Sequence, residues 1–167
     1  MQRIMIIGFA GAGKSTLARK LGEKLNIEQT YLDALFWKPG WSNGSYQEVT
    51  EKLNSIISRE KWIIDGRYNQ CAYDEQIALA DTIIMLDINR FTCFYSAVKR
   101  SIVYRKKSRP CRAEGYSDGL TLWFVSWVLY RGRRNRQEML NMLKNLVDKR
   151  VVILKTRKQV NEFVANL

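Results

Sequence analysis

The segment Gly8-Phe-Ala-Gly-Ala-Gly-Lys-Ser15 matches the pattern G-x-x-x-x-G-K-[ST] without a gap. Its glycines permit backbone conformations that are closed to other residues, so that successive N–H groups can point inward at phosphate oxygens. An apolar run over 3–7 precedes the segment, and leucines spaced by four over 17–25 follow it. These runs predict a strand before the segment and a helix after it, which is the context that this motif requires. The segment therefore predicts a phosphate-binding loop (P-loop, Gly8–Ser15).

Each part of the P-loop has an expected role in holding a nucleoside triphosphate. Lys14 supplies a cation to the β- and γ-phosphates, and Ser15 offers its hydroxyl to Mg²⁺. The helix that follows presents its positive N-terminus to the anion. Thr16 is either a further phosphate ligand or a threonine on the helix surface. The nucleotide-binding candidates of this segment are Gly8, Gly11, Ala12, Gly13, Lys14, Ser15 and Thr16.

Short apolar runs alternate with amphipathic segments along the rest of the chain. The pattern predicts strands over 3–7, 29–32, 62–64, 82–86 and 151–154. It predicts helices over 14–25, 90–107, 120–131 and 137–147, a helix capped by a Ser45–Glu48 capping box, and a last helix capped by Thr156. Strands with nearly continuous apolar cores, separated by helices, predict an α/β domain with a parallel sheet covered on both faces. We expect residues 1–167 to form this one domain, with an arginine-rich lid and flanking helix over about 105–136.

Acidic residues follow the predicted strands, at the edge of a parallel sheet where ligands bind. Asp65 and Asp87 are alternative ligands for Mg²⁺. We favour Asp65, because Gly66 leaves room for a ligand and Arg67 follows at once. The competing role for Asp87 is to cap the next helix. Asp33 closes the second strand, where it could position an acceptor hydroxyl and take its proton; an acceptor phosphate would need no base.

Residues near these carboxylates are candidates for binding a phosphate acceptor. Arg67 is well placed to hold an anionic group on such a molecule. Trp37 and Trp41 flank Pro39-Gly40, where they either stack on a planar acceptor or seal the core. The acceptor-binding candidates are Asp33, Trp37, Trp41, Arg67 and Arg134.

Positive charge is concentrated in the second half of the chain. The chain carries 28 Lys and Arg against 16 Asp and Glu, a net charge of +12. Between Lys99 and Arg136 there are eleven basic residues against two acidic ones. Such a concentration implies an anionic partner, which could be a phosphorylated small molecule, a nucleic acid or a membrane surface.

Arginines of the lid can serve phosphoryl transfer. That reaction needs positive charge over the equatorial oxygens and the exclusion of water. Arg105 and Arg109 are the catalytic candidates of the lid, and Arg100 is a nucleotide-binding candidate. The competing interpretation is nucleic-acid binding, because basic residues alternate with aromatic ones in this region. The aromatics concerned are Tyr104, Tyr116, Trp123 and Trp127.

The composition excludes several classes of protein. The chain has no histidine, which excludes histidine-based acid–base catalysis, His-ligated zinc and haem. Its three cysteines are scattered, so we expect reduced thiols in the cytoplasm and no disulfide framework. The longest apolar run, Leu120–Tyr130, is much shorter than the roughly 20 residues of a membrane span. The guanine motif Asn-Lys-x-Asp and the transporter motif Leu-Ser-Gly-Gly-Gln are both absent, which favours a small-molecule kinase over a GTPase or a transporter ATPase.

The chain as a whole resembles the adenylate-kinase-related P-loop proteins of the DNA topology modulation (FlaR-type) family. Besides the P-loop, the resemblance is carried by Leu32-Asp-Ala-Leu-Phe-Trp-Lys-Pro-Gly-Trp41, Lys61-Trp-Ile-Ile-Asp-Gly66, Ala80-Asp-Thr-Ile-Ile, Arg109-Pro110 and Val152-Ile-Leu-Lys-Thr-Arg157. It implies a nucleotide-kinase fold with strand order 2-3-1-4-5 and ATP with Mg²⁺ as the cofactor. It also implies that the loop around Thr156 and Arg157 faces adenine.

The chain departs from this pattern on the acceptor side. Asp65-Gly66 resembles the start of the Asp-Gly-Phe-Pro-Arg element of adenylate kinases, but Arg67-Tyr68-Asn69 replaces Phe-Pro-Arg. Asp33 is nearer to the pattern of shikimate and gluconate kinases. We therefore expect an ATP-dependent phosphotransferase, monomeric or homodimeric, that acts on a small nucleotide- or hydroxyl-bearing acceptor. The alternative is a nucleotide-dependent, nucleic-acid-binding regulator of DNA topology.

Overall fold

Five parallel strands form the centre of the computed structural model, which describes residues 1–36, 45–103 and 132–167. The strands are β1 (Arg3–Gly8), β2 (Gln29–Tyr31), β3 (Trp62–Asp65), β4 (Thr82–Leu86) and β5 (Arg150–Leu154). They are hydrogen-bonded in the order β2-β3-β1-β4-β5, and all four pairings are parallel. The expected fold class and strand order are confirmed.

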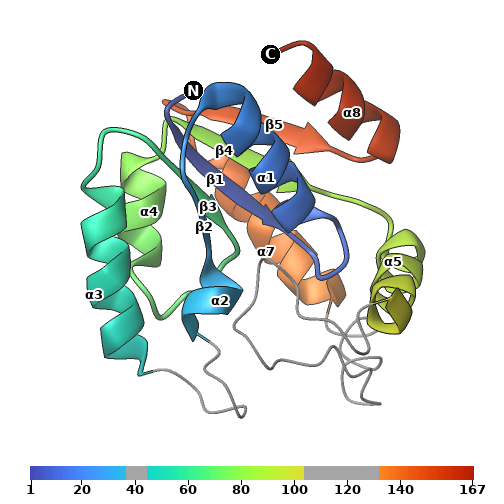
Figure 1. Ribbon diagram of the computed structural model, residues 1–167, viewed down its shortest axis with the longest axis horizontal. Coiled ribbons are helices and arrows are strands. Elements are labelled where there is room, and N and C mark those ends of the chain that lie inside the picture. Colours follow the sequence, from blue (N-terminus) through green and yellow to red (C-terminus); the bar gives the residue numbers. More distant parts are fainter. Residues whose placement is uncertain (37–44, 104–131) are drawn as a thin grey trace.

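Helices cover both faces of the sheet (Figure 1). One face packs against α1 (Lys14–Leu25) and α8 (Arg157–Ala165). The other face packs against α3 (Tyr46–Ile57), α4 (Tyr73–Leu79) and α7 (Gly132–Lys144). The short helix α2 (Leu32–Phe36) follows β2 directly, and α5 (Arg90–Val103) follows β4. The result is a three-layer sandwich whose carboxyl edge carries the P-loop.

The two halves of the core are set by the alternation of side chains along β1. Met5 and Ile7 belong to the cluster with α3 and α7, whereas Ile4 and Ile6 belong to the cluster with α1 and α8. All four side chains are fully buried. A strand that is apolar at every position is what a sheet with two covered faces requires.

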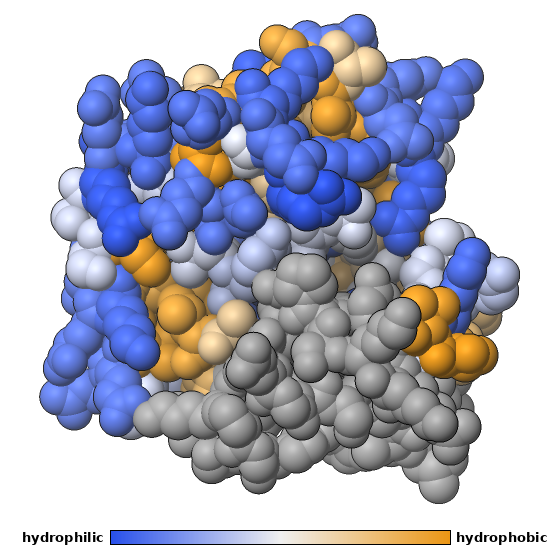
Figure 2. All heavy atoms as spheres, in the orientation of Figure 1, coloured by the Kyte–Doolittle hydropathy of each residue, from blue (hydrophilic) through white to orange (hydrophobic). Residues whose placement is uncertain are grey.

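Helix α5 leaves large side chains exposed. Its buried residues are Cys93 and Ala97, and Cys93 belongs to the core cluster with α1 and α8. Its exposed aromatic and aliphatic side chains are those of Phe91, Tyr95, Ile102 and Val103. Figure 2 shows an orange patch at the right, where Figure 1 places this helix. Among the described residues, α5 therefore carries an apolar outer surface beside its core-facing one.

The sequence patterns missed two helices and misplaced the ends of others. Leu32 was expected to end a strand, but it begins α2. Helix α4 has only seven residues, too few to show a clear helical period, and was not predicted. Helix α7 begins at Gly132 and not at 137, and it ends at Lys144. The predicted loop over 108–119, the predicted helix over 120–131 and the last four residues of the predicted helix over 90–107 lie outside the described residues.

Ser45 and Thr156 cap two helices at the predicted positions, and the reciprocal capping box is shown at Thr156. The Ser45 hydroxyl accepts a hydrogen bond from the Gln47 N–H at 3.2 Å and so begins α3. Thr156 begins α8 with a reciprocal capping box: its hydroxyl accepts from the Gln159 N–H, and the Gln159 side chain accepts from the Thr156 N–H. This box fixes the start of α8 beside the P-loop.

An aspartate joins β1 to β4 at the edge of the sheet opposite the P-loop. The carboxylate of Asp81 accepts hydrogen bonds from the Gln2 N–H at 2.7 Å, the Arg3 N–H at 2.9 Å and the Thr82 hydroxyl at 2.6 Å. Partial burial opposes its ionisation, but these hydrogen bonds and the N-terminal charge outweigh burial and lower the pKa of Asp81. Because the folded state favours the charged carboxylate, its stabilising effect is lost as the pH falls through this lowered pKa.

We therefore expect Asp81→Asn to lower the free energy of unfolding at neutral pH by about 1 kcal/mol, a value reduced for solvent screening. The difference in the free energy of unfolding between the two proteins should disappear as the pH drops below 3.8, the ordinary pKa of an aspartate. Urea unfolding of both proteins at neutral and at strongly acidic pH measures this gap. A gap that stays constant with pH would show that the charge on Asp81 does not contribute.

Candidate active site

The P-loop turns from the central strand into α1 at the carboxyl edge of the sheet. Gly8, Gly11 and Gly13 have φ angles of 143°, 80° and 97°, a range that other residues rarely adopt. Gly13 is the N-cap of α1, and no side chain caps this helix. The first amides of α1 are therefore available to an anion in the loop. The strand–loop–helix context that the motif requires is confirmed.

The polar side chains of the P-loop lie along the same turn. The Lys14 ammonium group donates a hydrogen bond to the Phe9 carbonyl at 3.3 Å, so this side chain folds back over the loop. Ser15 is partly buried, and Thr16 is exposed. Ala12 is fully buried. The arrangement places a cation, a hydroxyl and the helix amides around one turn, which is the donor set that a triphosphate needs.

Arg157 contacts the P-loop from α8. Its guanidinium group donates to the carbonyl of Ala12, to that of Gly11 at 3.0 Å and to the Ser96 hydroxyl at 3.3 Å. The sequence predicted that Arg157 binds the nucleotide. The structure places its guanidinium on the outer carbonyls of the loop, a contact that the sequence did not indicate.

Asp65 ends β3 next to the P-loop strand. Its backbone is in register with Ile6 of β1, and its side chain is buried, with 6% exposure. Gly66 follows with a φ angle of 122° and donates its N–H to the Ile6 carbonyl at 3.1 Å. The sheet thus holds this carboxylate beside the strand that leads into the P-loop. The oxygen donors of Ser15 and Asp65 fit the preference of Mg²⁺ for hydroxyl and carboxylate ligands.

Asp87 does not cap the following helix. The Asn89 side chain does so, accepting from the Phe91 N–H at 2.9 Å. Asp87 instead forms a two-point ion pair with Arg136 of α7, at 2.6 Å and 2.8 Å. The Asp87 side chain is only 6% exposed, whereas that of Arg136 is 51% exposed. Sequence reasoning could not foresee this pair, because the two residues are 49 positions apart.

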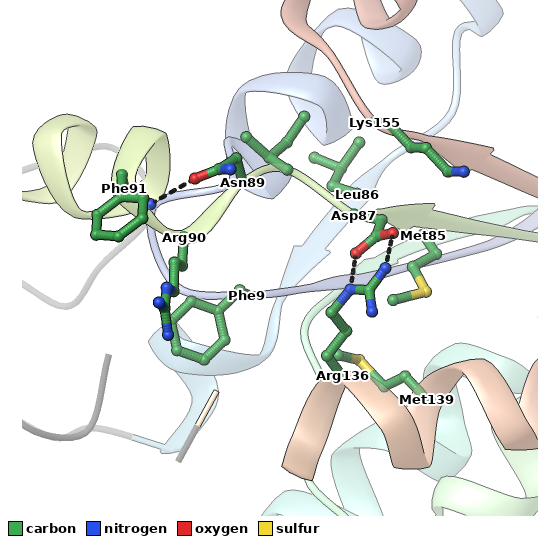
Figure 3. A pocket seen from close by; sticks show the side chains of 11 residues that line it. Phe9, Met85, Leu86, Asp87, Asn89, Arg90, Phe91, Arg136, Met139 and Lys155 are labelled. Carbon is green, nitrogen blue, oxygen red and sulfur yellow. Dashed lines mark hydrogen bonds and ion pairs between the residues drawn. The ribbon is translucent and has the colours of Figure 1, made fainter. Parts of the chain in front are cut away.

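This ion pair lies on the wall of a cavity of about 580 Å³ (Figure 3). The cavity is bounded by the end of β4, the start of α5, the first half of α7 and Phe9 of the P-loop. Its surface is mainly apolar, with Met85 and Met139 on the side of α7. Arg90 and Lys155 add positive charge to its lining. Asp33 and Arg67 do not line it, so it is separate from the predicted acceptor residues.

The predicted acceptor residue Asp33 is held by a hydrogen bond on the other side of the P-loop strand. The exposed carboxylate of Asp33, in α2, accepts a hydrogen bond from the Tyr68 hydroxyl at 2.9 Å. Tyr68 in turn stacks on Phe36, with ring centroids 4.9 Å apart. The segment after β3 therefore fixes the carboxylate that follows β2.

Arg67 and Arg134 meet at one carboxylate. Glu138 accepts from Arg134 at 3.0 Å and from Arg67 at 3.5 Å. Arg67 also donates to the Asn69 side chain at 2.8 Å, and its guanidinium lies 5.4 Å from the centre of the Tyr73 ring. Burial raises the pKa of Tyr73, although Arg67 opposes the rise. The structure thus brings together two predicted arginines.

Several site residues were not found from the sequence. Tyr68 and Glu138 hold predicted residues in place, and Arg136 pairs with a predicted carboxylate. The only local signal was the spacing of four between Arg134 and Glu138, which is typical of an ion pair on a helix. The predicted residues Trp37, Trp41, Arg105 and Arg109 lie outside the described residues, and Arg100 lies near the end of α5.

Several solved structures with a similar fold are kinases. A deoxyadenosine kinase from M. mycoides with bound dATP is 17% identical, with a TM-score of 0.57, and the match covers 98% of this chain and 97% of that one. A shikimate kinase from Bacteroides thetaiotaomicron is 22% identical, with a TM-score of 0.58, covering 99% and 95%. A shikimate kinase from Acinetobacter baumannii in complex with shikimate is 17% identical, with a TM-score of 0.63, covering 99% and 90%. These matches show that the chain has the P-loop kinase fold.

No family model matches the chain, and no curated protein matches it. None of the described helices is long and apolar enough to cross a membrane. Within residues 1–36, 45–103 and 132–167, no three Cys, Asp or Glu side chains gather into a metal-binding cluster.

We expect Asp87→Asn to lower the free energy of unfolding by about 2 kcal/mol, because it breaks a charged hydrogen-bonded pair whose carboxylate is buried. The matched control is Glu23→Gln, which breaks the exposed pair of Arg19 and Glu23 at 2.6 Å. That change should cost less than about 0.5 kcal/mol. Chemical denaturation of the three proteins measures both values. Equal losses of unfolding free energy in the two variants would show that the buried pair of Asp87 and Arg136 stabilises the fold no more than an exposed pair does.

Proposed function

We propose that this protein binds ATP with Mg²⁺ and transfers the γ-phosphoryl group to a small acceptor. The observation that carries the proposal is the conformation of the P-loop. Its glycines adopt positive φ angles, the N-terminus of α1 has no side-chain cap, and Lys14 lies across the turn. Backbone amides, a helix dipole and a cation converge there, which is the chemistry that holds a polyphosphate.

The described residues support one of the two candidate carboxylates for the metal. Both oxygens of Asp87 accept hydrogen bonds from Arg136. We assign the metal to Ser15 and Asp65, whose hydroxyl and carboxylate oxygens lie at the start of α1 and the end of β3. When bound, Mg²⁺ would neutralise negative charge on the phosphates.

We assign the acceptor to the space next to Asp33, Arg67 and Arg134. In the proposed step, an acceptor hydroxyl oxygen forms a bond to the γ-phosphorus while the bond to the β-phosphate oxygen breaks, which releases ADP. The hydroxyl proton passes to Asp33. The neighbouring structures are named for deoxyadenosine, shikimate and sugar kinases, whose named substrates all carry hydroxyl groups. Lys14 would neutralise charge that develops on the transferred group.

The remaining predicted residues complete this proposal. Trp37 and Trp41 would stack on a planar acceptor, and Arg105 and Arg109 of the lid would cover the transferred group. Arg100 would bind the nucleotide from α5. The resemblance to the DNA topology modulation family supports the same nucleotide site. Nucleic-acid binding through Lys99–Arg136 stays a prediction, because residues 104–131 lie outside the described part of the chain.

We expect Lys14→Met to reduce turnover by at least about 100-fold, because it removes a cation that stabilises charge in the transition state. The control is Lys20→Met on the same helix, whose ammonium group contacts Asn161 at 3.2 Å, away from the P-loop. Turnover is measured as release of ADP, and binding of Mg·ATP is measured by calorimetry. If the parent protein takes up no Mg·ATP, the proposed function is wrong.

We expect Asp33→Asn to reduce acceptor-dependent ADP release by about 10²- to 10⁴-fold, the usual contribution of a general base. Its affinity for Mg·ATP should not change, because Asp33 lies on the acceptor side. The acceptor is first found by a thermal-shift screen of phosphorylatable metabolites, since a ligand bound by the native state raises the melting temperature. The control is Asp74→Asn on the exposed start of α4. Full activity of Asp33→Asn would point instead to an acceptor phosphate, which needs no base.

A further inference from the structure

The outer surface of the P-loop needs hydrogen-bond donors of its own. A loop that directs its N–H groups toward a phosphate leaves carbonyl groups to be satisfied elsewhere. Arg157 supplies donors to two consecutive carbonyls, those of Gly11 and Ala12. One planar guanidinium group can serve two neighbouring oxygens in this way, whereas an ammonium group cannot do so in a fixed geometry.

The backbone that carries Arg157 is itself fixed. Arg157 is the first residue of α8, directly after the capping box of Thr156 and Gln159. The Gln159 side chain also accepts from the Lys155 N–H at 2.8 Å, which joins the end of β5 to the helix. The guanidinium therefore extends from a rigid corner of the fold and not from a loose loop.

Two glycines of the P-loop lie close to the elements that surround it. A Cβ atom on Gly13 would lie 2.2 Å from the Arg157 Nη1 atom. A Cβ atom on Gly11 would lie 2.2 Å from the Cys93 carbonyl oxygen of α5. Arg157 also reaches the Ser96 hydroxyl of α5. The P-loop is thus held from outside by α5 and by Arg157, in addition to any ligand inside it.

We propose that Arg157 is a positioning residue that holds the P-loop in its phosphate-binding shape. This inference rests on the proposed nucleotide site, and it differs from a role in contacting adenine. A residue that contacts the base affects only ligands that carry a base. A residue that shapes the loop affects every polyphosphate ligand equally, and it acts before any ligand arrives.

The binding experiment compares Mg·ATP with Mg·tripolyphosphate, which has the same chain of phosphates and no base. We expect Arg157→Met to weaken the binding of both ligands by the same factor, about tenfold or more, because two charge-assisted hydrogen bonds are lost. Arg157→Lys keeps the charge and should fall between the parent and Arg157→Met. The control is Lys158→Met, one residue further along α8, whose side chain is 85% exposed. A loss confined to Mg·ATP would overturn the proposal and assign Arg157 to the base.

Hydrogen exchange of the ligand-free protein tests the same role independently. We expect amides 11–15 to exchange faster in Arg157→Met than in the parent, while amides 4–7 of β1 keep their protection. Unchanged exchange at 11–15 would overturn the proposal, even with equal losses for both ligands, because it would indicate direct contact with phosphate. If the parent binds neither ligand, the proposed function fails, whereas the exchange measurement still decides whether Arg157 holds the loop.

Discussion

The path of the backbone from β1 into α1 is the constraint on which the rest of the site depends. Turning successive amides toward one point requires positive φ angles at Gly8, Gly11 and Gly13, so the loop has few side chains with which to hold itself. Its shape must then come from its surroundings. The central position of β1 fixes one end, the capping box of α8 brings in Arg157, and the backbone of α5 closes against Gly11. Three separate elements, β1, α5 and α8, therefore converge on eight residues.

The strand order gives the two neighbouring carboxylates different environments. Because β1 lies between β3 and β4, Asp65 and Asp87 follow strands on opposite sides of the P-loop strand. Both carboxylates are largely buried, and a buried carboxylate needs a compensating charge or hydrogen bonds. For Asp87 the compensation is built in, since Arg136 occupies both of its oxygens. The ion pair thereby attaches α7 to the end of β4.

The sequence predicted the motifs and elements that depend on neighbouring residues. It missed the contacts between residues that are far apart in the chain. The P-loop, the five strands and the cap at Thr156 have local signatures, and each was found. The strand order came from the family resemblance, because periodicity alone does not say which strands pair. The ion pair of Asp87 and Arg136 and the contact of Arg157 with Gly11 join residues 49 and 146 positions apart. Helix α4 was missed because seven residues give too short a pattern.

The cations at the P-loop and those near Glu138 have different kinds of partner within the protein. Lys14 and Arg157 donate to neutral carbonyls, so their charge is not cancelled by a carboxylate at those contacts and can attract a polyphosphate. Arg67 and Arg134 instead share the carboxylate of Glu138. Any anion that approached these two arginines would have to compete with Glu138 for them. The described cations at the P-loop and those near Glu138 therefore differ in how far their charge is compensated within the protein.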